Sequence, residues 1–162
     1  LSLDQMPNRE KIIQNFFKKI ENHYDFILFD TNPAISTLNR NIIVYSQIIN
    51  IVCETQALSI NGLKILFEDL KKFFHLMSME VPSIFIIPNK YEDKMNSSAE
   101  SMSALINFYF EYLKPNFAIR KSEDINNAVK QGLPISCFAR NNSNSLEDII
   151  ELIREIVAKS SE

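Results

Sequence analysis

Short apolar runs alternate with longer segments of helical periodicity, and this alternation constrains the fold more than any other feature of the chain. The apolar runs at 24–30, 48–53 and 81–88 are predicted to be buried strands. The segments that follow these runs are predicted to be helices, at 38–46, 59–77 and 98–113. Because strands that alternate with helices pair in parallel, we expect an α/β fold with three layers, a mostly parallel sheet flanked by helices.

The beginning of the chain and the region after the third helix extend this pattern. Asn8 is a suitable N-cap for an amphipathic helix at about 8–22. A further short strand is expected near 116–119, where a brief apolar run follows Pro115. The length of 162 residues suits one domain, so residues 1–162 are predicted to form a single domain.

Two more helices are expected toward the carboxyl end, and both carry end signals. Ser122 is a suitable N-cap for the first, and Gly132 is a suitable terminator because glycine readily adopts the left-handed conformation that ends many helices. Ser145 with Asp148 resembles a capping box for the last helix, at about 146–158.

The first predicted strand ends in a carboxylate. It belongs to the run Tyr-Asp-Phe-Ile-Leu-Phe-Asp-Thr-Asn-Pro at 24–33, in which Thr-Asn-Pro turns the chain away directly after Asp30. Open α/β sheets bind their ligands at the carboxyl ends of parallel strands. This is the layout of a Walker B strand, whose aspartate helps to hold the magnesium ion of a bound nucleotide. The alternative interpretation is a buried strand that ends in a solvated aspartate serving only as a helix N-cap.

The chain has too few glycines for a phosphate-binding loop. Its only glycines are Gly62 and Gly132, whereas such a loop needs several glycines followed by Lys and Ser or Thr. As given, the chain is therefore not expected to be a complete P-loop ATPase, and its start at Leu1 suggests a piece of a longer product. Cys53 and Cys137 have no metal-binding spacing, and a net charge of −3 gives no overall attraction to nucleic acid or membrane.

Four features occur in the order found in ParA/MinD-type (Soj-like) partition ATPases, which the chain resembles from about residue 22 to its end. The first is the run at 24–33, which is similar to the Walker B and switch II segment of that family. The others are the 48–53 strand followed by Glu54 and by Leu-Ser-Ile-Asn-Gly-Leu at 58–63, the Ile-Ile-Pro-Asn-Lys run at 86–90, and the series Ile119, Arg120, Ile125, Ala128, Gly132 and Pro134.

The resemblance has three departures. Asn32 replaces the first proline of the family's Asp-Thr-Pro-Pro, and Ala34 stands where a glycine is common, so the switch II turn should differ in backbone freedom. The proline often found just before Arg120 is also missing, which weakens the assignment of a base-side loop there.

The resemblance implies the fold, the activity and the cofactors. The fold would be part of a P-loop NTPase fold, and the chain would be the C-terminal portion of a ParA-like ATPase domain, without the Walker A half. The full-length protein would bind ATP and Mg²⁺, hydrolyse ATP and act in plasmid or chromosome partition, whereas this chain alone would be inactive.

The resemblance also implies site residues. Asp30, Thr31 and Asn32 would be catalytic, with Asp30 also holding the metal ion through water. The residues that would contact the nucleotide are Asn89, Lys90, Arg120 and Pro134. The residues that would contact DNA, from a locally basic stretch of an otherwise acidic chain, are Lys114, Lys121 and Lys130.

The partners implied are a second copy of the chain in a homodimer, a ParB-like centromere-binding protein and duplex DNA bound without sequence preference. The location would be cytoplasmic and associated with the nucleoid. Membrane binding is disfavoured because the last helix is acidic, with Glu147, Asp148, Glu151 and Glu155. Two alternatives remain: a non-enzymatic dimerisation or adaptor module without a P-loop, and another enzyme on the same scaffold, which the isolated cysteines disfavour.

Overall fold

The computed structural model of the chain describes residues 9–32, 36–113, 117–137 and 143–159. The predicted cap Asn8 and the predicted DNA contact Lys114 lie outside these residues. The chain divides into two compact units, one of residues 1–49 with 69–83 and the other of residues 50–68 with 84–162.

The described part of the first unit begins at Arg9 with short helices rather than the predicted continuous helix at 8–22. A 3-10 turn at Arg9–Lys11 leads into α1 (Ile12–Phe17), and a second 3-10 turn follows at Glu21–His23. The cap of α1 comes from a distant residue: the side-chain oxygen of Asn41, in α2 (Thr37–Tyr45), accepts from the backbone N–H groups of Ile12 and Ile13 at 2.9 and 3.2 Å. Asn41 is fully buried, and its amide donates to two backbone carbonyls, so its polar atoms are paired.

The predicted strand at 24–30 is wrong. This run belongs to no strand, and it is not buried on both faces, because Leu28 is 84% exposed. Its burial alternates instead: the ring of Phe29 packs edge-on against Phe17 of α1 and Tyr45 of α2, while Phe26 and Leu28 are exposed. The physical reason is that an extended segment forms a strand only beside another, and the described residues place none next to it.

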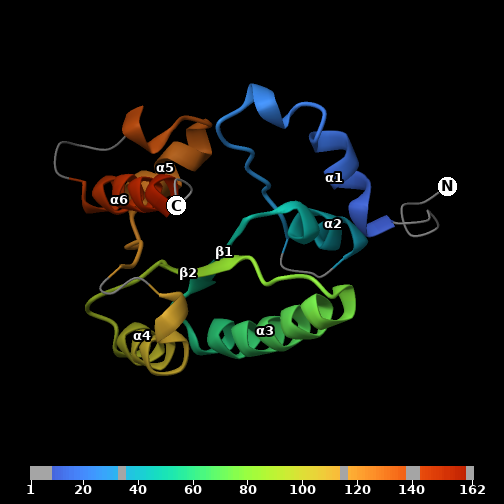
Figure 1. The fold of residues 1–162 in the computed structure, drawn as a ribbon. Helices are drawn as coiled ribbons and strands as arrows, with labels where there is room; N and C mark the ends of the chain where they lie inside the picture. The colour runs from blue at the N-terminus through green and yellow to red at the C-terminus, as the bar shows by residue number, and fades with distance from the viewer. Residues whose placement is uncertain (1–8, 33–35, 114–116, 138–142, 160–162) are drawn as a thin grey trace. The chain divides into compact units, whose positions relative to one another are not determined.

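The prediction of a parallel sheet flanked by helices is confirmed. Strands β1 (Ile48–Glu54) and β2 (Ser83–Asn89) are neighbours joined by the long helix α3 (Ala57–Met77), as Figure 1 shows. The predicted ranges 48–53, 59–77 and 81–88 match these elements closely. Alternate β1 residues Ile51 and Cys53 are buried, whereas Val52 between them is exposed, so one face of β1 is covered more fully than the other.

The second unit places helices on both faces of these strands. On one face, Phe67 of α3 packs against Tyr109 of α4 (Asn96–Tyr109) and Tyr112 of the 3-10 turn Phe110–Tyr112, with ring centroids 5.2 and 4.8 Å apart. On the other face, Leu152 and Ile156 of α6 (Asn144–Lys159) approach Phe85 and Ile87 of β2 around a small apolar cavity. The helix between them is α5 (Glu123–Gln131), followed by a 3-10 turn at Ile135–Cys137.

The end signals of α5 are confirmed. Ser122 Oγ accepts from the backbone N–H of Asp124 at 3.1 Å, and Gly132 ends the helix in the left-handed conformation, with φ of 63°. The N–H of Leu133 then bonds to the carbonyl of Ala128 at 3.0 Å, which completes a Schellman-type ending.

The predicted capping box of the last helix is wrong. α6 begins at Asn144, and the carbonyl of Ser143 accepts from the N–H groups of Leu146 and Glu147. Asp148 does not turn back to Ser145, because its carboxylate binds Arg120 instead. The Asp148 carboxylate therefore forms a tertiary ion pair with Arg120 and not the local capping contact that the sequence predicts.

Candidate functional site

The carboxyl ends of β1 and β2 meet a third segment at one edge of the sheet. The N–H of Thr55 donates to the carbonyl of Asn89 at 3.1 Å, which extends the pairing of β1 and β2 beyond Glu54. Beyond β2, Tyr91 and Arg120 form a parallel bridge, with hydrogen bonds of 3.0 Å on either side of it. Within the described residues 117–121, the strand predicted near 116–119 is thus reduced to this bridge, and the positions of Glu54, Asn89 and Arg120 meet at this edge.

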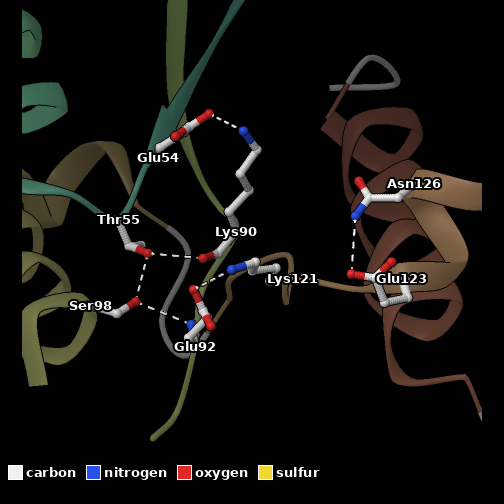
Figure 2. Close-up of polar contacts among 8 residues, drawn as sticks. All are labelled: Glu54, Thr55, Lys90, Glu92, Ser98, Lys121, Glu123 and Asn126. Carbon is white, nitrogen blue, oxygen red and sulfur yellow. Dashed lines mark hydrogen bonds and ion pairs between the residues drawn. The ribbon is translucent and has the colours of Figure 1, made fainter. Parts of the chain in front are cut away.

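The backbone of the loop after β2 is strained at Lys90. Its φ is 55°, a value that residues other than glycine seldom adopt. Two contacts accompany this conformation: the side-chain oxygen of Asn89 accepts from the Lys90 N–H at 2.9 Å, and the Lys90 ammonium pairs with Glu54 at the end of β1 (Figure 2). Asn89 and Lys90, the two predicted nucleotide contacts of this loop, therefore also stabilise its backbone conformation.

Two buried hydroxyl groups lie directly beneath the loop. Thr55 and Ser98 are 3% and 2% exposed, and their side-chain oxygens are 2.7 Å apart. Thr55 Oγ1 donates to the carbonyl of Lys90 at 3.4 Å, and Ser98 Oγ accepts from the N–H of Glu92 at 3.1 Å, as Figure 2 shows. Sequence reasoning missed both residues, although Thr55 directly follows a predicted strand and Ser98 opens a predicted helix, which are usual places for polar side chains that fix loops.

The predicted DNA-contacting lysines differ in their surroundings. Lys121 is paired with Glu92, with Nζ and Oε1 2.9 Å apart, on the same edge as the Glu54–Lys90 pair (Figure 2). Lys130 is exposed in the last turn of α5, where a cation complements the helix dipole. On the same helix, Asn126 donates to Glu123 at 3.5 Å.

Arg120 is held by Asp148, which lies in the second turn of α6. The carboxylate of Asp148 accepts from the backbone N–H, Nε and a terminal nitrogen of Arg120, at 3.0, 2.9 and 2.5 Å. The same guanidinium donates to the carbonyl of Asn144 at 3.1 Å. The hydrogen bond to Asp148 is the largest influence on the pKa of Arg120, which is raised above its usual value. The fork-shaped pairing fixes the plane and direction of the guanidinium.

A hollow of about 590 Å³ opens beside this pair. Arg120, Asp148 and Tyr91 contribute to its wall, together with apolar residues of α4 that include Met102 and Ile106. The Arg120 side chain is 35% exposed, so a ligand can reach the guanidinium while Asp148 holds it. Pro134 is exposed between Gly132 and the turn that starts at Ile135, where its carbonyl accepts from the N–H of Cys137 at 3.0 Å.

The predicted catalytic residues lie in the first unit. Asp30, Thr31 and Asn32 are exposed and lie outside helices and strands. Asn32 is tied to α2 because the Asn39 amide donates to both its backbone and side-chain oxygens at 2.8 and 2.9 Å. Within the described residues no group of three metal-ligating side chains occurs. A nucleotide-bound Mg²⁺ takes most of its ligands from phosphates and water and needs only one or two carboxylates, so an exposed Asp30 is compatible with that role.

The comparison with protein families decides the classification. The AAA domain family matches residues 1–82, which is half of the chain. The chain belongs to the ParA/MinD-type family of partition ATPases. Its similarity to PomZ, a cell division protein of Myxococcus xanthus, is 28% identity over 159 residues, covering 98% of the chain and 49% of PomZ. The chromosome-partitioning ATPase Soj of Treponema pallidum is 23% identical over 155 residues, covering 96% of the chain and 60% of Soj.

The solved structures agree with the classification of the fold. An ATP complex of McdA from Cyanothece superposes with a TM-score of 0.76 at 19% identity, over 92% of this chain and 57% of McdA. The chain thus spans about half the length of the relatives it matches. In the part of the chain that the structure describes, no helix is long and apolar enough to cross a membrane.

Proposed function

We propose that this chain supplies the carboxyl-terminal portion of a ParA-like ATPase domain that acts in plasmid or chromosome partition. Family membership and the likeness to PomZ, Soj and McdA support this proposal. The observation that carries it is the meeting of the ends of β1, β2 and the 119–121 segment at one edge, because open parallel sheets bind their ligands there.

The nucleotide base would lie against this edge. Asn89 offers an amide that can bond to the rim of adenine, and the stem of Lys90 offers apolar surface to its ring. Arg120 is oriented by Asp148 and remains reachable, which is a suitable arrangement for a base or sugar contact. Pro134 would complete the contact surface, as its family position suggests.

Hydrolysis would depend on Asp30, Thr31 and Asn32. Phosphoryl transfer to water requires positioning and charge stabilisation rather than a covalent intermediate, and bound Mg²⁺ supplies neutralisation of the developing negative charge. Asp30 would hold a metal-bound water and help to orient the attacking water. Thr31 and Asn32 would respond to the terminal phosphate, and the Asn32–Asn39 contact offers a link from that response to α2.

The whole protein would dimerise around ATP, bind duplex DNA without sequence preference and be stimulated by a ParB-like centromere-binding partner, in the cytoplasm and at the nucleoid. Lys114, Lys121 and Lys130 are the proposed phosphate contacts. Because Lys121 is paired with Glu92, it would have to exchange this carboxylate for a phosphate, an exchange between two partners of similar kind.

One sequence observation keeps a second candidate open. The chain contains two glycines and no Gly-rich loop followed by Lys and Ser or Thr. A non-enzymatic dimerisation or adaptor module on the same scaffold would need neither the loop nor a catalytic Asp30.

The two candidates are separated by ATP hydrolysis in the complete protein, compared between Asp30→Ala and Asp25→Ala. Both aspartates are exposed in the same segment outside helices and strands, so removal of either should cost the fold little. We expect hydrolysis to be lost in Asp30→Ala, and Asp25→Ala to behave as the parent. Equal rates in all three proteins would refute the role of Asp30, and no hydrolysis by the parent would favour the adaptor.

A further inference from the structure

The hydroxyl groups of Thr55 and Ser98 form a chain of hydrogen bonds with one direction. The carbonyl of Lys90 can only accept, so the Thr55 hydroxyl donates its proton there and must accept from Ser98. Ser98 in turn donates to Thr55 and accepts from the N–H of Glu92. Each hydroxyl therefore donates once and accepts once, and the order runs from Glu92 through Ser98 and Thr55 to Lys90.

This series of hydrogen bonds contacts the backbone of the loop after β2 on both sides of Tyr91. It holds the carbonyl of Lys90, whose left-handed backbone conformation is unfavourable for a residue with a side chain, and it holds the amide of Glu92. A strained conformation persists only where its surroundings fix it. The buried hydroxyl pair, with the Glu54–Lys90 ion pair above it, provides such surroundings.

We propose that Thr55 and Ser98 are positioning residues for the base-contacting loop at 89–92, and that their hydroxyl pair sets the preference of the site for adenine. The two residues touch the loop backbone and act on the base through Asn89, whose carbonyl already pairs with the Thr55 N–H. This inference rests on the proposed nucleotide-binding function. The kind of ligand concerned is a purine nucleotide read through hydrogen bonds at the rim of its base.

The first test is amide hydrogen exchange in the 162-residue chain, with Thr55→Val as the decisive variant. Valine keeps the shape of threonine but removes the donor to Lys90 and the acceptor for Ser98. Thr55 does not touch the Glu92 amide, yet we expect that amide and the Tyr91 amide to exchange about tenfold faster, as the loss of a buried hydrogen bond would allow. Thr55→Ser restores the hydroxyl and should return exchange to the parental rate.

Ser103→Ala is the control. Ser103 lies on α4, the helix that carries Ser98, and its hydroxyl donates within that helix to the carbonyl of Ala99 at 3.0 Å. It should leave the Tyr91 and Glu92 amides unchanged. The Ala128 amide of α5 reports whether each variant is folded. Unchanged exchange at Tyr91 and Glu92 in a folded Thr55→Val variant would overturn the inference.

The second test measures the ratio of ATP to GTP affinity in the complete protein. We expect this ratio to fall about tenfold in Thr55→Val and to be restored in Thr55→Ser, because one correctly placed hydrogen bond is worth about that factor. Equal weakening of both nucleotides would show a merely structural role and contradict the inference. If the parent bound no ATP, the proposed function and its base preference would fail together, while hydrogen exchange would still decide whether the hydroxyls hold the loop.

Discussion

Replacement of Asp148 by Asn should destabilise the second unit through the loss of its bond to Arg120. Asp148 is 8% exposed and accepts three hydrogen bonds from Arg120. An asparagine of the same shape loses the charge and turns an amide group toward the guanidinium. Breaking one side of a fully buried ion pair costs about 3–5 kcal/mol.

The expected loss is smaller than that range because water reaches part of the Arg120 side chain, which is 35% exposed. We estimate a loss of about 2 kcal/mol in the free energy of unfolding. With a urea dependence of about 2 kcal/mol per M, the midpoint of unfolding should fall by about 1 M, measured by circular dichroism.

Glu147→Gln is the matched control, since Glu147 is the exposed neighbour of Asp148 in α6 and carries the same charge near the start of that helix. It should change the free energy of unfolding by less than about 0.5 kcal/mol. Arg120→Lys keeps the charge but loses the fork-shaped contact, and we expect an intermediate effect. Equal urea midpoints for Asp148→Asn and Glu147→Gln would refute the reasoning.

Three further predictions concern reactivity, DNA and turnover. Burial, and to a smaller extent the nearby Glu54 charge, raises the pKa of the Cys53 thiol to about 11. At pH 8 a disulfide reagent should therefore react with Cys137 alone in the native chain and with both thiols after unfolding. Fast reaction of Cys53 in the native chain would contradict this prediction. In the nucleotide-bound complete protein, alanine at both Lys121 and Lys130 should reduce the slope of log binding constant against log salt concentration by about two for DNA. An unchanged slope would place the DNA-binding surface elsewhere. The 162-residue chain alone should hydrolyse no ATP above a buffer blank, because phosphate binding needs a Gly-rich loop that its sequence lacks, and measurable turnover would show this prediction to be wrong.

The elements that sequence reasoning located well are those whose signals are local. Ser122 and Gly132 bracket α5 as expected because a cap and a left-handed terminator act within one turn of the residue that supplies them. The order β1–α3–β2 was predicted from apolar periodicity, because the spacing of apolar residues reflects which face of each element is buried. The edge at which Glu54, Asn89 and Arg120 meet lies where parallel strands place their carboxyl ends.

The failures share a different cause, which is dependence on residues far away in the sequence. The run at 26–29 has the composition of a buried strand, but a strand forms only beside another, and only the Phe29 side of this run is covered. The start of α1 is capped by Asn41 of α2. The Asp148 carboxylate pairs with Arg120 and does not cap its own helix. No periodicity or local motif predicts these tertiary contacts.

The candidate site shows the same division. Asn89, Lys90 and Arg120 were found because they follow strands, whereas Thr55 and Ser98 are small polar residues whose importance appears only when the loop conformation is known. Asp30, Thr31 and Asn32 stay predictions, as do the DNA contacts and the single domain.

The most direct test of the proposed nucleotide site is to map where an adenine nucleotide attaches to the complete protein. The protein would be irradiated with 8-azido-ATP and Mg²⁺, digested, and the modified peptide identified by mass spectrometry, with excess ATP as competitor. We expect an adduct at 89–93 or 118–121 that ATP suppresses, because the proposed base site lies at the edge formed by the ends of β1 and β2. An ATP-suppressible adduct outside these segments, or none at all, would contradict the central claim.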